Sequence, residues 1–156
     1  IDIKGIDITL EVAEKMKEEE FLIVGSADEE TEERLKELDN VEFKGYLEDI
    51  REAYRDSKIV IMPSTEMETF GRIPVEAGIS GIPSVVSGNG GLMESTGDEC
   101  FAVGENQAEN YIEKIKDIEE SYSEYSEKSV ENAKSKDYRN YLPQLKETVE
   151  ELRDEA

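Results

Sequence analysis

The 156-residue chain contains no histidine and a single cysteine, Cys100. The absence of histidine excludes Ser-His and Cys-His catalysis and the usual zinc sites within this polypeptide. One cysteine cannot form an internal disulfide, so nothing indicates secretion. Cys100 lies in an apolar, strand-like run, which favours a packing role over a nucleophilic one. We therefore expect a cytoplasmic protein.

Basic residues are also scarce, since 18 Lys and Arg stand against 40 Asp and Glu, for a formal net charge of −22. Nucleic acids and anionic membranes bind proteins largely through Lys and Arg, so neither is an expected partner. Such an acidic composition with globular patterning is typical of a solvated, salt-adapted surface and fits a halophilic cytoplasm. The alternative is that the acidic surface recruits a basic partner.

Long apolar runs are missing as well. No stretch approaches the roughly 18 to 20 residues of a membrane span, so we expect no transmembrane segment, and no signal peptide is visible. A chain of 156 residues is large enough for one domain with a real core. Because it opens with Ile rather than Met, we interpret it as a piece of a longer protein.

Short apolar runs alternate with amphipathic or charged segments over the first two thirds of the chain. The apolar runs predict strands at 21–24, 41–43, 59–62, 84–86 and 101–103. The segments between them predict helices at 6–16, 29–38, 48–56 and 73–80. Strands that alternate with helices imply right-handed βαβ units. We therefore predict an α/β fold with a Rossmann-like, doubly wound parallel sheet.

The last third has a different pattern, with two apolar stripes at helical spacing over residues 111–125 and 142–152. A stripe of this kind is more often core than a cofactor site. Residues 121–136 are rich in Ser, Glu and Lys, and we expect them to have little to bury. The sequence thus predicts a sheet domain over 1–121 and a C-terminal helical tail over 122–156 that docks outside the sheet.

Four predicted strands end in residues that form loops, namely Gly25-Ser26, Gly45-Tyr46, Pro63-Ser64 and Gly88. In open α/β sheets the ligand crevice lies at the carboxyl ends of the strands. Glycines there let backbone amides approach a ligand. Any one of these glycines could simply belong to a loop that binds no ligand. Together, the four loops predict a ligand pocket at this edge of the sheet.

Two glutamates follow the strand at 59–62. Glu68 precedes the pair Phe70-Gly71 in the loop, and Glu76 lies about one turn into the next helix. In a chain with 40 acidic residues their spacing carries no weight, but their placement beyond the end of a strand does. A carboxylate on such a helix can accept two hydrogen bonds from the diol of a ribose. The alternative is that Glu76 only complements the helix dipole.

Four motifs occur in order between residues 4 and 105. They are Lys4-Gly5-Ile6-Asp7, Val41-Glu42-Phe43-Lys44-Gly45-Tyr46, the segment 63–83 with Glu68-Thr69-Phe70-Gly71 and Glu76-Ala77-Gly78, and Ser87-Gly88-Asn89-Gly90-Gly91-Leu92-Met93-Glu94. Together they resemble the signature of family-4 retaining glycosyltransferases of GT-B architecture, the glycosyl transferases group 1. In that family the paired glutamates, with seven residues between them, belong to the donor site.

The resemblance implies a role for each matching position in binding a nucleotide-sugar. Glu68 would be catalytic and contact the transferred sugar, Glu76 would hold the ribose, and Lys4 would neutralise the diphosphate of the leaving group. The other implied donor-binding residues are Tyr46 and Leu47 beside the base, Phe70, Gly71 and Arg72 facing the sugar or diphosphate, and Gly90, Gly91 and Glu94 along the crevice. The side chain of Arg72 would be a phosphate ligand or a surface partner for an acid.

The resemblance also implies a reaction that retains the anomeric configuration and needs no metal ion or other cofactor. Family members have two Rossmann-like halves, and the N-terminal half holds most of the acceptor site. The family's Gly-Arg, on the first strand of the donor domain, would precede residue 1. Residues 1–121 would thus be a donor-binding domain with a truncated first strand, and 122–156 would pack on a missing N-terminal domain. We expect a hexosyltransferase-type enzyme acting on a glycan, lipid or other acceptor, inactive as this fragment alone.

Two other functions stay open on the sequence. A sugar-nucleotide epimerase shares the GT-B architecture, although Glu68 and Glu76 around Phe70-Gly71 argue against it. A non-catalytic nucleotide-sugar-binding or interaction module would use the acidic surface to recruit a basic partner. In a nucleotide titration, saturable shifts at residues 68–76 would support the glycosyltransferase, and an absence of nucleotide binding would favour the interaction module.

Overall fold

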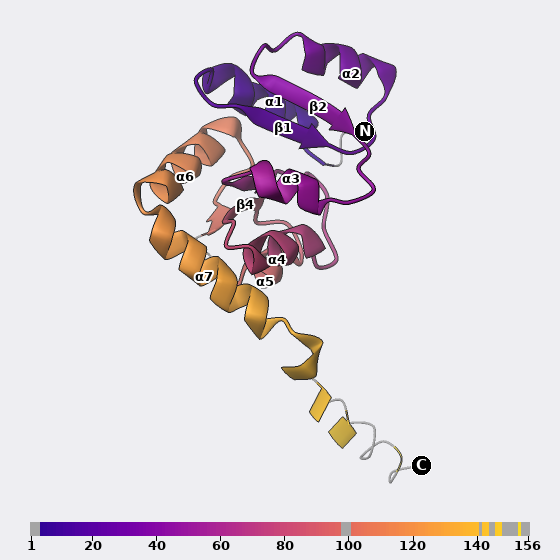
Figure 1. Cartoon of the computed structure of the whole chain (residues 1–156), viewed down its shortest axis with the longest axis vertical. Helices are drawn as coiled ribbons and strands as arrows, with labels where there is room; N and C mark the ends of the chain where they lie inside the picture. The colour runs from indigo at the N-terminus through magenta and orange to yellow at the C-terminus, as the bar shows by residue number, and fades with distance from the viewer. Residues whose placement is uncertain (1–3, 98–100, 141, 144–145, 148–152, 154–156) are drawn as a thin grey trace.

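The computed structural model describes residues 4–97, 101–140, 142–143, 146–147 and 153. In chain order its elements are α1 Ile6–Lys15, β1 Phe21–Val24, α2 Glu29–Lys36, β2 Val41–Gly45, α3 Arg51–Asp56, β3 Val60–Met62, α4 Arg72–Ile79, β4 Ser84–Ser87, α5 Leu92–Thr96, β5 Ala102–Val103, α6 Ala108–Glu120, α7 Tyr122–Ser135 and the 3-10 turn η2 Tyr138–Asn140 (Figure 1). All strand pairs are parallel, which confirms the predicted α/β class.

The strands form two hydrogen-bonded sheets where the sequence predicts one. β1 pairs with β2, whereas β4 lies between β3 and β5. A cavity of about 1100 Å³ is lined by residues of both β1 and β3. In the described residues no strand pairs with the second edge of β1 or of β3, so the parallel strands of the predicted α/β fold lie in two sheets.

Local sequence chemistry sets where the helices begin. Asp28 caps α2 by accepting a hydrogen bond from the Thr31 amide at 2.9 Å. α1 begins after Gly5, which has a φ of 74°. A Cβ on Gly5 would lie 2.0 Å from the carbonyl oxygen of Pro63, so only glycine allows this approach. The contact places the start of α1 beside the carboxyl end of β3.

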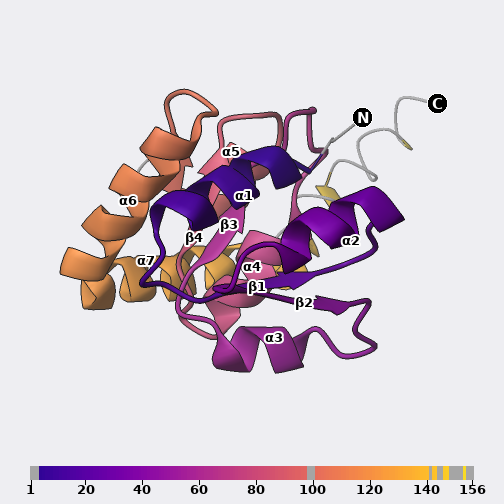
Figure 2. The ribbon, with the colours of Figure 1, turned by 90° about the horizontal axis from the view of Figure 1, so that it is seen from above.

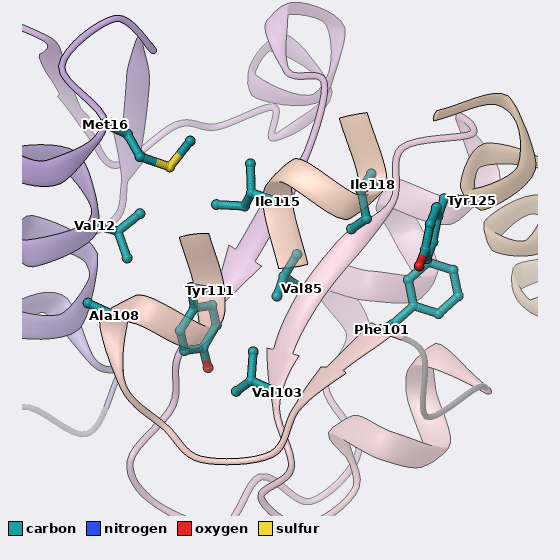
Figure 3. Packing of buried hydrophobic residues seen from close by; sticks show 10 residues of the cluster. All are labelled: Val12, Met16, Val85, Phe101, Val103, Ala108, Tyr111, Ile115, Ile118 and Tyr125. Atoms are coloured by element: carbon teal, nitrogen blue, oxygen red, sulfur yellow. The ribbon is translucent and has the colours of Figure 1, made fainter. Parts of the chain in front are cut away.

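The main core lies where α1 and α6 meet β4 and β5 (Figure 3). Its buried residues are Val12, Met16, Val85, Phe101, Val103, Ala108, Tyr111, Ile115, Ile118 and Tyr125. The first predicted stripe is therefore core, as expected, but Ser121 divides it between two helices. Tyr125 on α7 meets Phe101 edge-to-face, with 5.7 Å between the ring centroids, so α7 is joined to the same core.

α7 also packs closely against α4 through small residues (Figure 1). A Cβ on Gly78 would lie 2.8 Å from the carbonyl oxygen of Ser129 and 3.2 Å from the Cβ of Ala133. The hydroxyl of Ser126 donates to the carbonyl of Gly81 at 2.7 Å. The prediction that residues 121–136 have little to bury is wrong, because the small residues of this segment let the backbone of α7 pack directly against α4. The packed body therefore extends through α7, past the predicted boundary at residue 121.

The second predicted stripe and Cys100 fall largely or wholly outside the described residues. Leu142 is described and is 39% exposed, whereas Leu145, Val149 and Leu152 are not described. That this segment packs on another domain stays a prediction. Within the ranges that the structure describes, no helix is both long and apolar enough to cross a membrane.

The α4–α7 contact can be tested with the substitution Gly78→Val. Its Cβ would meet the Ser129 carbonyl at 2.8 Å, and backbone cannot move aside cheaply, so we expect a loss of about 1–3 kcal/mol in the free energy of unfolding. Urea denaturation followed by circular dichroism measures it. Gly104→Val is the matched control, because nothing lies within 4 Å of a Cβ there. Equal stability of the two variants would contradict the packing.

Candidate functional site

The loop 63–71 carries the candidate site from the end of β3 to the start of α4. Pro63 and Ser64 are buried, and Glu68 is half-buried, with 20% of its side chain exposed. Lys4 Nζ forms a hydrogen-bonded ion pair with Glu68 Oε1, and Ser64 Oγ donates to the same oxygen at 3.0 Å. The structure thus places two of the predicted site residues, Lys4 and Glu68, in direct contact.

Gly90 and Gly91 hold this loop from the β4 side. The Gly91 amide donates to the carbonyl of Glu68 at 2.7 Å, and Glu68 and Gly90 form an isolated parallel bridge. A Cβ on Gly90 would lie 2.3 Å from the Glu68 carbonyl oxygen, and one on Gly91 2.3 Å from that of Thr69. The predicted Phe70 lies at the same contact, 2.6 Å from the position of that Gly91 Cβ. Only glycine at positions 90 and 91 therefore leaves room for the backbone of the loop 63–71 at this distance.

Asparagines that the sequence reasoning did not single out as site residues fix the base of the loop. Asn89 Nδ2 donates to the carbonyl of Ser64 at 2.7 Å, and Asn106 Nδ2 donates to those of Pro63 and Ser64 at 3.2 Å. The hydroxyl of buried Tyr111 donates to Asn106 Oδ1 at 2.8 Å. Asn89 lies inside one of the four motifs. Asn106 lies 42 residues after Ser64, and nothing around it in the sequence indicates this contact.

The ion pair sets the charge state of Glu68. Lys4 lowers the pKa of the Glu68 carboxyl through their hydrogen bond, and Ser64 lowers it further, while partial burial opposes both. The carboxylate is therefore ionised at neutral pH. An ionised carboxylate accepts hydrogen bonds and donates none, which suits it to contact hydroxyl groups.

Glu76 lies in the middle of α4 and is half-buried. The hydroxyl of Tyr54, on α3, donates to Glu76 Oε2 at 3.1 Å. Burial and then the negative charge of Glu76 raise the pKa of Tyr54, so the phenol stays protonated as a donor. Tyr54 is a second contact that the sequence reasoning missed, because the two residues come from different helices.

The first turn of α4 favours anions although the chain is strongly acidic. Gly71, with a φ of 78°, precedes the helix, and a Cβ there would lie 2.5 Å from Leu92 Cδ2 of α5. Arg72 is exposed at the first helical position, and that turn contains no acidic residue. Free amides and the positive end of the helix dipole therefore lie next to the loop of Glu68.

Three predicted donor-binding residues, Tyr46, Leu47 and Glu94, are not bonded to the ion pair of Lys4 and Glu68. Tyr46 directly follows β2 and is 79% exposed, and Leu47 beside it is half-buried. Glu94 is exposed in the first turn of α5. No hydrogen bond or ion pair joins any of these three to Lys4 or Glu68 in the described structure. Their predicted roles stay predictions.

Comparison with known proteins decides the family. A family model described as glycosyl transferases group 1 matches residues 2–136. This chain belongs to the glycosyl transferases group 1. The resemblance inferred from the four motifs is thereby confirmed, and it extends through α7.

Solved structures of glycosyltransferases share the fold of this family member. HepE of Anabaena in complex with UDP-glucose has a TM-score of 0.76 and 23% identity, over 96% of this chain and 46% of that one. Sucrose-phosphate synthase of Thermosynechococcus elongatus has a TM-score of 0.78 and 20% identity, over 99% of this chain and 43% of that one. The fold is thus the Rossmann-like α/β fold of GT-B glycosyltransferases.

A curated relative is more similar in sequence over a shorter region. Mannosylfructose-phosphate synthase of Agrobacterium fabrum is 37% identical over 87 residues, which are 53% of this chain and 18% of that protein. This family member therefore spans less than half the length of each of these three relatives.

The electrostatic role of Lys4 can be tested with Lys4→Met. Losing the ion pair should raise the pKa of Glu68 toward the ordinary range of a glutamate, as measured by NMR titration of the side-chain carboxyl. The lowered pKa stabilises the fold above the pKa of the unfolded carboxyl, and this stability is lost as the pH falls through the folded pKa. As the pH is lowered, the variant should therefore unfold at a higher pH than the parent chain does.

The matched control is Lys36→Met, which removes a surface pair with Glu32 at 3.7 Å on α2. It should leave the titration of Glu68 unchanged. An unchanged Glu68 pKa in Lys4→Met would refute the ion pair.

Proposed function

We propose that this chain is the donor-binding half of a retaining glycosyltransferase, which moves a sugar from a nucleotide-sugar to an acceptor. The observation that carries the proposal is the Lys4–Glu68–Ser64 cluster, held on the loop that leads into the helix of Glu76. A cation, an ionised carboxylate and a helix N-terminus thus lie along one loop at the carboxyl end of β3. This is the edge where open α/β sheets bind ligands.

The nucleotide is held at two points in this proposal. Glu76 accepts hydrogen bonds from the two ribose hydroxyls, and Tyr54 orients its carboxylate from α3. Lys4, Arg72 and the first amides of α4 meet the diphosphate. The ammonium of Lys4 has three N–H donors, so it can contact a phosphate oxygen while it stays paired with Glu68.

Transfer depends on stabilising charge that develops at the reacting centre. As the bond to the leaving diphosphate breaks, negative charge grows on its oxygen, and Lys4 lies where it can compensate that charge. Glu68 accepts hydrogen bonds from hydroxyls of the sugar beside the reacting carbon. In a retaining reaction the acceptor attacks on the face from which the diphosphate leaves.

The relatives support the class of donor. HepE was solved in complexes with UDP-glucose and with UDP, which makes a uridine nucleotide the first ligand to test here. This chain covers 46% of HepE, which supports a second half that would hold most of the acceptor site. A cytoplasmic location and a reaction without metal ion or other cofactor complete the proposal.

The proposed role of Glu76 predicts a loss of nucleotide affinity in Glu76→Ala. Losing charge-assisted hydrogen bonds to both ribose hydroxyls should weaken binding of UDP at least about tenfold. Titration with UDP, followed by NMR shifts of the amides of 68–76, measures it. Glu68→Gln should bind UDP as the parent does, because UDP lacks the transferred sugar that Glu68 would contact, but should bind UDP-glucose more weakly.

Glu66→Ala is the matched control, since Glu66 is an exposed acid on the same loop. It should bind both ligands as the parent chain does. Tyr54→Phe should weaken UDP binding less than Glu76→Ala, because it only frees the carboxylate to move. Parent-like affinity for UDP in Glu76→Ala would contradict the assignment of the ribose contact.

The fragment should transfer no sugar by itself, because most acceptor contacts would lie in the other half. Incubation with UDP-glucose and glycan acceptors should give no glycoside by mass spectrometry. A UDP titration on the same sample confirms that the donor site is intact. Robust turnover by the fragment would show that the half-site interpretation is wrong.

A further inference from the structure

One asparagine side chain serves two consecutive carbonyls of the loop that carries the candidate site. Asn106 lies between β5 and α6, and its Nδ2 is 3.2 Å from the carbonyl oxygen of Pro63 and 3.2 Å from that of Ser64. A side-chain amide nitrogen carries two N–H groups, so it can donate to both carbonyls at once. Pro63 and Ser64 directly follow β3, where the loop begins.

The polarity of its partners explains why an asparagine stands at position 106. The two backbone carbonyls can only accept, so the group that faces them must donate. On its other side the hydroxyl of Tyr111 donates to Asn106 Oδ1 at 2.8 Å. An amide meets both requirements. A carboxylate of the same size would set an oxygen against two carbonyl oxygens and leave them without a donor.

Tyr111 sets the direction of this amide from within the core. It is fully buried on α6, and its ring belongs to the main core (Figure 3). Burial raises the pKa of its hydroxyl, so the phenol keeps its proton and stays a donor. α6 in turn packs beside α1 and against β4 (Figure 2). The amide of Asn106 is therefore oriented by the packed body of the protein.

The carbonyl of Ser64 leads from this amide to the carboxylate of the site. It also accepts from Asn89 Nδ2 at 2.7 Å, so both of its lone pairs are used. Ser64 is 1% exposed, and its hydroxyl donates to Glu68 Oε1 at 3.0 Å. Because the carbonyl is fixed, the hydroxyl of the same residue meets the carboxylate from a fixed place.

The carbonyl of Pro63 leads to the ammonium of the site. Gly5 approaches it so closely that a Cβ on Gly5 would lie 2.0 Å from its oxygen. Lys4 directly precedes Gly5, and its Nζ pairs with Glu68 Oε1. A movement of the Pro63 carbonyl would therefore displace the backbone that carries Lys4.

We propose that Asn106 is a positioning residue that holds both members of the pair of Lys4 and Glu68 in place. Its amide acts on the carboxylate through Ser64 and on the ammonium through Pro63. The two charged groups come from opposite sides of the β3 loop, and this one side chain is bonded to the start of both routes. It touches neither charged group itself.

The consequence for ligand binding rests on the proposed function, in which Lys4 meets the diphosphate and Glu68 meets the sugar. One donor molecule then contacts both groups, so their separation must suit the ligand. Loss of the Asn106 amide should weaken binding of UDP-glucose about fivefold, which is the effect of one ordinary hydrogen bond. Titration with UDP-glucose, followed by NMR, measures it.

The positioning itself is tested without ligand, in the 156-residue chain, with Asn106→Ala and Tyr111→Phe. Neither substitution changes the charge, so a shift in the pKa of Glu68 reports an altered geometry. NMR titration should show this pKa raised in both variants, and more in Asn106→Ala, which removes the donor outright. Asn110→Ala is the matched control, because the amide of Asn110 donates to the carbonyl of Glu105 at 3.0 Å on the same segment.

Backbone amide signals separate the two routes. Asn106→Ala should shift the signals of both Gly5 and Glu68. Asn89→Ala should shift that of Glu68 and leave that of Gly5 in place, because the amide of Asn89 donates to the carbonyl of Ser64.

A double-mutant cycle tests whether Asn106 acts through the ion pair. With Lys4→Met already present, Asn106→Ala should raise the pKa of Glu68 less than it does in the parent chain, because the route through the ammonium is gone. A purely structural role would lower the stability to urea and leave this difference at zero.

An unchanged pKa of Glu68 in Asn106→Ala and in Tyr111→Phe would overturn the proposal, and so would an equal rise in Asn110→Ala. If Asn106→Ala does not fold, Tyr111→Phe alone decides, because it keeps the ring in the core. A raised pKa in a chain that binds no UDP-glucose would support the positioning role and refute the proposed function. An unchanged pKa with parent-like affinity for UDP-glucose would refute the positioning role alone.

Discussion

The hydrogen bond from the Gly91 amide to the carbonyl of Glu68 fixes the loop on which the candidate site depends. This contact joins the turn after β4 to the turn after β3, and it is possible only because Gly90 and Gly91 have no side chain. The fixed loop presents the Glu68 carboxylate to Lys4 and sets the point where α4 begins. The site is therefore positioned by backbone, and its charged side chains act from a rigid support.

The sequence predicts the elements well because the apolar runs are short and bounded by glycine or polar residues. Errors fall at helix ends, where single side chains decide. The predicted helix 48–56 begins at Arg51 in the structure, and just ahead of it the Asp49 carboxylate accepts a hydrogen bond from the Arg51 amide at 3.1 Å. Glu68 and Glu76 could be singled out because each has a fixed place relative to β3, which the order of elements already gives.

What could not be predicted depends on residues far apart in the chain. Asn106 reaches the carbonyl of Ser64 only after the whole fold has formed, and nothing around Asn106 in the sequence indicates that partner. The packing of α7 was not predicted, because at Gly78 and Ser129 backbone packs against backbone, and hydrophobic patterning does not detect such a contact. The division into two sheets was not predicted for a similar reason. The sequence of a strand indicates that the strand is buried, but it does not indicate which strands pair with it.

α4 has two different contacts on two of its faces. Glu76 meets Tyr54 on one side, and Gly78, about 200° further around the helix, meets Ser129 of α7. Because the second contact is backbone against backbone, α7 cannot shift along its axis or roll without carrying α4 with it. The position of α7 is thus linked through α4 to the carboxylate of Glu76. Under the proposed ribose contact, a change in how α7 packs on α4 would alter the affinity for the nucleotide without any residue near the nucleotide being touched.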